Sequence, residues 1–344
     1  MKIPGRSKLR RSLHKLQKRF APKALILMYH RVGEVDIDPW ALCVTPENFA
    51  EHLEVLQKDY HPLSLTELVK AHQGGKLPNR SVAITFDDGY ADNLHQAKPL
   101  LNRYGIPATV FVSTGYLGQQ REFWWDELER LVLAPGQLPE KLSLKINGKT
   151  HELELGTARN YTQQDYKGDR TAKAHKSIPG SRMFFYYELW QLLRPLPENE
   201  RLQALEDIRI WADAKPTARH SHRSLLPEEV SLLGDGELVE IGAHTVTHPF
   251  LSEQPTALQA DEIQGSKTQL EEMLNRPVTT FSYPFGNYTT ETVELARNAG
   301  FSCACSTVED TVWTQSQRFQ LPRFGAENWN GEEFAKQLSR WFHG

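Results

Sequence analysis

Short apolar runs alternate along the chain with segments in which apolar residues recur at helical spacing. The runs predict strands at residues 24–30, 82–86, 108–112, 238–241 and 278–281. The periodic segments predict helices at residues 46–58, 90–104, 257–274 and 290–298. Because strands and helices alternate, we expect a parallel sheet covered by helices, and within the α/β class a barrel.

The alternation stops between residues 119 and 225. Apolar residues at 142–146 and 153–155 alternate on either side of Asn147-Gly148, which is typical of a hairpin with a type I′ turn. Residues 156–182 are polar and rich in turn formers and predict a mobile loop, and helices are expected at 183–193 and 198–212. We therefore divide the chain into an arm (1–22), a barrel (23–118 and 226–344) and an insertion (119–225) that we expect to cap a site.

Two clusters of polar residues follow predicted strands. Asp87 and Asp88 end one strand, where adjacent carboxylates suggest a site because one of them would lose its hydration inside a strand. His244 and His248 follow another strand. One Asp and both His make a three-ligand set for a divalent metal with an open position, which leaves the other Asp free as a base. The structural alternatives are helix capping for the Asp pair and turn hydrogen bonds for the His pair.

Three motifs then resemble a known family. Residues 85–90 (TFDDGY), 244–248 (HTVTH) and 282–286 (SYPFG) resemble, in this order, the first three motifs of the polysaccharide deacetylases, the NodB-homology domain of carbohydrate esterase family 4. The resemblance implies a distorted (β/α) barrel of the NodB-homology type, here with a central insertion. It also implies hydrolysis of N-acetyl groups on an amino-sugar-containing polysaccharide or lipid-linked glycan. The implied cofactor is one divalent metal, with zinc first and Co²⁺, Mn²⁺ or Ni²⁺ as alternatives.

The chain departs from the family pattern at two points. Ser282 stands where the third motif normally begins with an Arg that holds the base, and the His of the last motif has only His343 as a counterpart. Residues 27–32 (LMYHRV) resemble the opening strand of the poly-N-acetylglucosamine deacetylases, in which the His comes from the first strand. His30 is therefore the candidate acid, and Arg323 is the candidate for the missing guanidinium. A core histidine and a surface arginine are the structural alternatives.

These residue types support a complete reaction. The expected metal ligands are Asp88, His244 and His248. Asp87 would take a proton from the attacking water, and His30 would protonate the leaving amine. The backbone N–H of Phe285 would stabilise the oxyanion. Acetate and a free amino sugar would result.

Aromatic and turn residues near the motifs are candidates for substrate contacts. They are Tyr90, Tyr283, Pro284 and Trp125. The alternatives are a simple turn at residues 283–286 and a core position for the tryptophan. Two other functions stay open: hydrolysis of another amide or an O-acetyl ester, and carbohydrate binding without catalysis.

The net charge of −3 conceals an asymmetry. Residues 1–33 contain ten Lys or Arg and no acid, so the rest of the chain carries −13. Within residues 6–20, apolar side chains recur at helical spacing between basic ones, which predicts either peripheral contact with an anionic membrane or a helix docked on its own domain. Nucleic acid is not expected as a partner, because the acidic body would repel phosphates.

The cysteine count and the hydropathy pattern bear on location. Three cysteines are an odd number, so we expect reduced thiols rather than disulfides. The apolar run near the start is too short to span a bilayer, and no signal-peptide pattern precedes it. We therefore expect a cytoplasmic protein, with membrane association through the arm as one of the two readings of residues 6–20.

Overall fold

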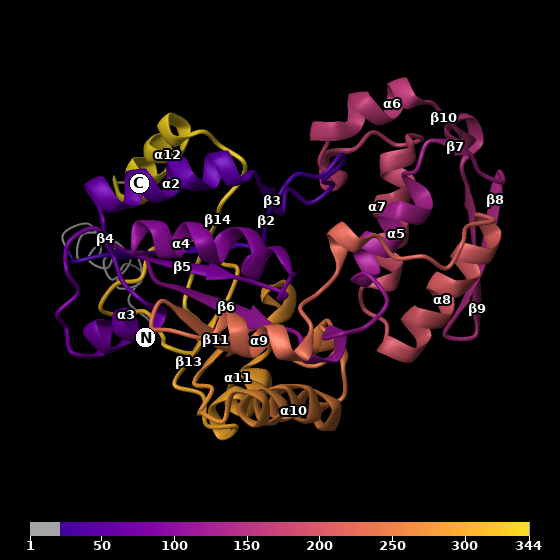
Figure 1. The fold of residues 1–344 in the computed structure, drawn as a ribbon. Helices are drawn as coiled ribbons and strands as arrows, with labels where there is room; N and C mark the ends of the chain where they lie inside the picture. Colours follow the sequence, from indigo (N-terminus) through magenta and orange to yellow (C-terminus); the bar gives the residue numbers. More distant parts are fainter. Residues whose placement is uncertain (1–20, 344) are drawn as a thin grey trace, which may run out of the picture.

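A curved parallel sheet lies at the centre of the barrel region in the computed structural model, which describes residues 21–343 (Figure 1). In spatial order its strands are β13 (Cys303–Cys305), β12 (Thr280–Ser282), β11 (Val239–Ala243), β6 (Ala108–Val112), β5 (Ser81–Phe86), β1 (Ala24–Tyr29) and β14 (Phe324–Gly325). The short β4 (His61–Pro62) also pairs with β5. Every pairing in this sheet is parallel, so the prediction of a (β/α) barrel is confirmed in the form of a curled, incomplete barrel.

Helices cover the outside of the sheet, as the connections between parallel strands require. They are α2 (Pro46–Asp59), α3 (Leu65–Gln73), α4 (Lys98–Tyr104), α9 (Pro227–Leu233), α10 (Thr256–Leu274), α11 (Thr290–Asn298) and α12 (Gly331–His343). The central strands β1 and β5 pair over six residues and are buried on both faces. Their continuous apolar runs are explained by this double burial.

Residues 321–325 connect β13, at one edge of the sheet, with β1 near the other edge. Leu321 forms a parallel bridge with Cys305 of β13, and its amide donates to the carbonyl of Ala304 at 2.9 Å. Two residues further on, β14 pairs with β1. This segment therefore spans the gap between β13 and β1 and carries Arg323 at the carboxyl end of the sheet.

The helix predicted at residues 90–104 begins later than expected. The regular part, α4, starts at Lys98 and is preceded by a π-helical turn, η1 (Asn93–Ala97). Pro99 explains the turn, because it has no N–H and its ring crowds the carbonyl four residues earlier. The Lys98 amide accordingly donates to the carbonyl of Asn93, five residues back.

The insertion forms a second body of structure with its own apolar core beside the barrel (Figure 1). Its main elements are α5 (Trp124–Val132), the hairpin strands β8 (Lys141–Ile146) and β9 (Lys149–Glu154), α7 (Arg182–Leu193) and α8 (Glu198–Trp211). The predicted hairpin is confirmed, with φ of 51° at Asn147 and 73° at Gly148 as a type I′ turn requires. Ion pairs Arg170–Asp36 and Lys173–Glu327 join the insertion to the barrel.

The prediction of a loop at residues 156–182 is wrong, because the segment contains regular structure. The segment contains β10 (Asn160–Tyr161), paired with β7 (Gly136–Gln137), the helix α6 (Gln163–Gly168) and the short turns η3 (Gly156–Arg159), η4 (Asp169–Thr171) and η5 (Ala174–Lys176). The buried guanidinium of Arg182 orders it by donating to the carbonyls of Ala158 and Arg159, both at 2.7 Å. A polar composition concealed this order, because the stabilising partners are backbone carbonyls.

Six further short elements complete the connections. They are β2 (Arg31–Val32), β3 (Cys43–Val44) and the turns η2 (Thr114–Tyr116), η6 (His220–His222), η7 (Leu251–Glu253) and η8 (Pro284–Gly286).

Cys43, Cys303 and Cys305 are buried free thiols, as expected. The basic arm at residues 6–20 lies outside the described residues. Among residues 21–343 no helix combines the length and apolar character needed to cross a bilayer.

His52 on α2 gives the barrel a pH-dependent contact. Its Nδ1 lies 3.0 Å from the Tyr29 hydroxyl and its Nε2 lies 2.8 Å from the carbonyl of Trp329, a pattern that suits the neutral ring. The ring also stacks on Phe334. Burial lowers the pKa of His52 from 6.5 to about 4. Because the folded-state pKa lies below that of the unfolded chain, this contribution is present above about pH 6.5 and is lost as the pH falls toward 4.

We expect His52→Gln to reduce the free energy of unfolding near neutral pH, and the difference from wild type to shrink by up to about 3 kcal/mol as the pH falls to about 4. Urea denaturation at a series of pH values measures this difference. The exposed His61→Gln is the control. A difference that stays constant with pH would show that protonation of His52 does not contribute.

Candidate active site

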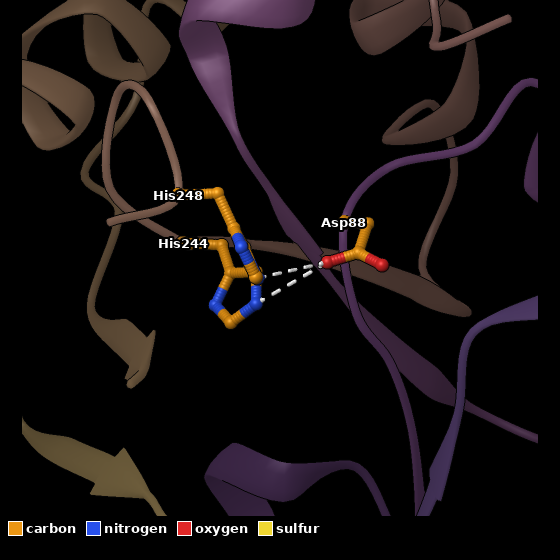
Figure 2. A group of neighbouring side chains, drawn as sticks. All are labelled: Asp88, His244 and His248. Atoms are coloured by element: carbon orange, nitrogen blue, oxygen red, sulfur yellow. Dashed lines mark ion pairs between the residues drawn. The ribbon is translucent and has the colours of Figure 1, made fainter. Parts of the chain in front are cut away.

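Three side chains from distant parts of the sequence meet at the carboxyl end of the sheet (Figure 2). Asp88 follows β5, and His244 and His248 follow β11. Asp88 Oδ1 lies 3.5 Å from His244 Nε2 and 3.3 Å from His248 Nε2, and all three side chains are buried. The Asp and the two His predicted from the sequence as one ligand set are therefore neighbours in the structure.

The spacing of these atoms suits a tetrahedral metal. Ligand atoms bound at 2.0–2.1 Å in a tetrahedron are about 3.3 Å apart. The measured separations of 3.3 and 3.5 Å are close to this value, and the ligand atoms all lie within 4.8 Å of one another. Carboxylate oxygen and imidazole nitrogen are also suitable donors for zinc and for its neighbours Co²⁺, Mn²⁺ and Ni²⁺.

The protonation of the two histidines favours metal binding. His244 Nδ1 lies 2.8 Å from the carbonyl of Ser282, so Nδ1 carries the proton and Nε2 presents its lone pair. Burial lowers the pKa of His248 to about 4, which keeps that ring neutral at physiological pH. Burial alone would raise the pKa of Asp88, but the contacts with His244 and His248 outweigh it and hold the pKa below its usual range.

The carboxylate ligand sits in a sharp turn. Asp88 has φ of 75°, and the Gly89 amide donates back across it to the carbonyl of Asp87 at 3.0 Å. Gly89 itself has φ of 84° and a Cβ there would lie 3.1 Å from Val112. Both the conformation and the contact require glycine at this position. The turn directs the Asp88 carboxylate toward the histidines.

The loop that carries the two histidines is strained and held from outside. Thr245 and His248 have φ of 64° and 53°, which is unfavourable for a β-branched residue in particular. The Glu262 carboxylate on α10 accepts from the amides of Val246 and Thr247, both at 2.8 Å, and from the Thr247 hydroxyl at 2.6 Å.

The insertion holds the same loop from its other side. Arg201 on α8 is fully buried and donates to the carbonyl of Thr247 at 3.1 Å. Its guanidinium also lies over the ring of Trp124 on α5. The insertion is thus attached to the segment that bears two of the candidate metal ligands.

Asp87 and Arg323 form a buried, bidentate ion pair. Arg323 Nη1 lies 2.7 Å from Asp87 Oδ1, and Nη2 lies 2.6 Å from Oδ2. Burial would raise the pKa of Asp87, but the Arg323 guanidinium reverses this and holds the pKa below its usual range. Asp87 Oδ2 also lies 3.9 Å from His244 Nε2, so the ionised carboxylate is beside the candidate metal ligands. Ser282 accepts from Arg323 at 2.8 Å.

The site opens into a cavity of about 270 Å³ with walls from both bodies of structure. His30 lines it from the barrel, together with Phe285, whose φ is 57°. Trp125, Trp190 and Arg194 line it from the insertion. The remaining wall residues are Met28, Trp40, Leu42, Asp87, Asp88, His244, His248 and Thr307. The insertion therefore contributes directly to the wall of the site.

Three of the four predicted substrate contacts do not line this cavity. The Tyr90 hydroxyl is buried and donates to Asp126 at 2.7 Å, while the Tyr283 hydroxyl donates to the carbonyl of Phe319 at 3.1 Å within the barrel core. Pro284 is buried in the turn η8. Only Trp125 stays a candidate, since its ring lies 4.8 Å from that of His248. Burial of a hydroxyl with a satisfied partner excludes it from contact with a ligand.

Sequence reasoning missed residues that reach the site from outside the motifs. Glu262 lies on a helix 14 residues beyond His248, and Trp190 and Arg194 lie in the insertion. The acidic side chain of Glu262 on a buried helical face was a usable signal, because carboxylates are rarely buried without partners. Trp190 and Arg194 gave no signal, because their position depends on how the insertion packs.

Comparison with known proteins agrees with this geometry. The family model for polysaccharide deacetylases matches residues 74–140 and 206–304. The chain is 28% identical over 197 residues to the poly-beta-1,6-N-acetyl-D-glucosamine N-deacetylase of Staphylococcus epidermidis, a match that covers 53% of this chain and 63% of the relative. It is 33% identical over 110 residues to the protein of the same name from Staphylococcus aureus, which covers 28% of this chain and 38% of the relative.

Solved structures share the fold. The Streptococcus pyogenes deacetylase PplD, in complex with acetate, superimposes with a TM-score of 0.54 and 20% identity over 92% of this chain and 99% of its own. IcaB from Ammonifex degensii gives a TM-score of 0.56 with 16% identity, over 94% of this chain and 98% of its own. On the match to the family model, the chain carries a polysaccharide deacetylase domain of the NodB-homology type, and these structures share its fold.

We expect Glu262→Gln to weaken metal binding about 10- to 100-fold, because residues that orient metal ligands contribute on this scale. Titration of the metal-free protein with Zn²⁺, followed by calorimetry, measures the dissociation constant. The exposed Glu272→Gln on the same helix is the matched control. A dissociation constant equal to that of wild type would mean that the loop holds its conformation without Glu262.

Proposed function

We propose that the protein is a metal-dependent hydrolase that removes N-acetyl groups from an amino-sugar-containing polysaccharide or lipid-linked glycan. The observation that carries the proposal is the placement of the Asp88–His244–His248 set beside the Asp87–Arg323 pair in one cavity. The names of the two staphylococcal relatives support the same reaction class. Cytoplasmic location and membrane contact through residues 6–20 stay predictions.

Asp88, His244 and His248 would hold the metal, and zinc is our first candidate because the set leaves an open fourth position. Such a metal lowers the pKa of water to about 7 and polarises a carbonyl when it is bound. The chain's own contribution is to orient the His244 ring through its Nδ1, to keep the His248 ring neutral and to keep the Asp88 carboxylate ionised before any ligand arrives.

Asp87 is the general base of the proposed reaction. Its carboxylate is ionised and buried, and the bidentate contact with Arg323 fixes its orientation. A water molecule beside the three-ligand set would lie within reach of it, because Asp87 Oδ2 is 3.9 Å from His244 Nε2. Removal of the proton lets the water oxygen attack the acetyl carbon.

His30 and Phe285 would complete the reaction from the cavity walls. The carbonyl oxygen becomes negative during attack, and the backbone N–H of Phe285 would donate to it. The C–N bond then breaks, and the nitrogen needs a proton because an amine is a poor leaving group when it departs as an anion. His30 would supply that proton, which gives acetate and a free amino sugar.

The proposed substrate is a sugar because the wall is aromatic on the insertion side. The ring of Trp125 lies against that of His248, and the ring centres of Trp190 and Trp40 are 4.2 Å apart. Flat indole rings beside a polar catalytic centre offer an apolar face to a sugar ring while its amide reaches the reacting groups.

We expect His244→Ala and His248→Ala to lose bound metal and acetate-releasing activity while they stay folded, because two ligands cannot retain the ion as three do. Elemental analysis of the purified proteins measures the metal, and the thermal midpoint reports folding. The exposed His220→Ala is the control. Full occupancy in both variants would contradict the ligand assignment.

We expect Asp87→Asn to keep metal but to lose about 10²- to 10⁴-fold in turnover, since this is the usual contribution of a general base. Acetate release from a panel of N-acetylated glycans measures the rate. His30→Ala should lose turnover likewise, and least on substrates with good leaving groups. Wild-type rates of His30→Ala on an unactivated N-acetyl sugar would place the acid elsewhere.

A further inference from the structure

A single guanidinium in the wall of the cavity has no anionic partner. Arg194 follows the last residue of α7 and lines the cavity from the insertion. Among residues 21–343 its side chain makes no hydrogen bond and no ion pair, and its Nε is buried without a partner. The other arginines with a buried unpartnered Nε, which are Arg121, Arg130 and Arg201, all have ion pairs or hydrogen bonds through their other nitrogens.

The carboxylates of the cavity are already engaged and leave Arg194 free. Asp87 is paired with Arg323, and Asp88 contacts the two histidines. The carboxylate that influences Arg194 most is that of the exposed Glu253, and it is not within ion-pair distance. Because a guanidinium stays charged at every physiological pH, the cavity wall keeps an uncompensated positive charge.

Two aromatic rings fix the position of this charge. The Arg194 guanidinium lies 4.7 Å from the ring centre of Trp190 and 4.2 Å from that of Phe250. Phe250 is two residues beyond His248 and its ring lies 5.9 Å from that of Phe285, which in turn lies 4.5 Å from His248. The guanidinium therefore lies near the reacting centre, two ring contacts from His248.

We propose that Arg194 binds an oxyanion of the substrate, so that the glycan carries a phosphate or carboxylate group close to the N-acetyl sugar that is hydrolysed. This inference rests on the proposed function. A planar guanidinium stacked between rings keeps its outward N–H groups free for a bidentate contact with such a group. Partial burial between the rings strengthens that contact, because a charged hydrogen bond is stronger where the local dielectric is lower than in water.

A neutral poly-N-acetylglucosamine chain would leave these donors unsatisfied. Its deacetylated residues carry ammonium groups, which Arg194 would repel. A phosphate, as in a lipid-linked sugar, or a uronic acid carboxylate would satisfy the guanidinium directly. Arg194 thus favours anionic glycans as substrates. The names of the staphylococcal relatives specify a different substrate, the neutral polymer of N-acetylglucosamine.

The test compares kcat/KM for acetate release from three disaccharides of N-acetylglucosamine: one neutral, one with a phosphate ester, and one in which the neighbouring sugar is a uronic acid. We expect the wild type to prefer one or both anionic substrates. The ratio of anionic to neutral kcat/KM should fall about 10- to 100-fold in Arg194→Met, which is the usual effect of losing a charged hydrogen bond. Arg194→Lys should retain part of the preference, and the phosphate and carboxylate arms identify the source of the oxyanion.

Arg209→Met, which removes a charge from α8 at a residue that does not line the cavity, is the matched control and should leave the ratio unchanged. The ratio separates recognition from a purely structural role, because an arginine that only supports Trp190 and Phe250 would lower activity on all three substrates equally. A wild type without preference for either anionic substrate, or an unchanged ratio in Arg194→Met, would overturn the inference while the deacetylase proposal stands.

A complete lack of acetate release would instead count against the proposed function. In that case calorimetric binding of the phosphorylated and uronic acid disaccharides to wild type and Arg194→Met still tests the inference. We expect weaker binding of the anionic sugars to the variant. Equal binding would overturn the assignment of Arg194.

Discussion

The buried contact between Arg323 and Asp87 serves both the fold and the proposed reaction. Arg323 lies on the segment that connects β13 with β1, and its guanidinium donates to Asp87, Thr85, Ser282 and the carbonyl of Ser306. Loss of either member of such a pair leaves a buried charge without compensation, which costs about 3–5 kcal/mol. The same interaction therefore stabilises the ring of strands and holds the proposed base ionised and correctly oriented.

A second constraint acts on the loop that bears the two histidines. The loop has two residues with positive φ that are not glycine, and it keeps this conformation because Glu262 of the barrel and Arg201 of the insertion bind its backbone. The backbone strain is thus balanced by buried hydrogen bonds from two separate bodies of structure. Through Arg201 the insertion is part of the support for the site, and through Trp125, Trp190 and Arg194 it is also part of the cavity wall.

The errors in the sequence-based predictions have a common physical origin. Tyr90 and Tyr283 belong to motifs that surround the site, yet their hydroxyls are satisfied in the interior by Asp126 and by the carbonyl of Phe319. A motif gives the position of a residue along the chain but not the direction of its side chain. Residues 156–182 likewise have a loop-like composition, and they are ordered because Arg182 provides donors for their carbonyls.

The sequence by itself determined the parallel α/β architecture and the set of Asp88, His244 and His248, because strand ends and short motifs are local properties of the chain. From the sequence, Arg323 was a candidate partner of the base Asp87 only because Ser282 stands where the family normally has an Arg. The bidentate contact between Arg323 and Asp87 is visible only in the structure. Tertiary structure alone decided that Glu262 supports the histidine loop and that Arg194 lines the cavity without an ion pair to any of residues 21–343. These contacts join residues through the packing of whole helices, and no local pattern in the sequence specifies how two helices pack.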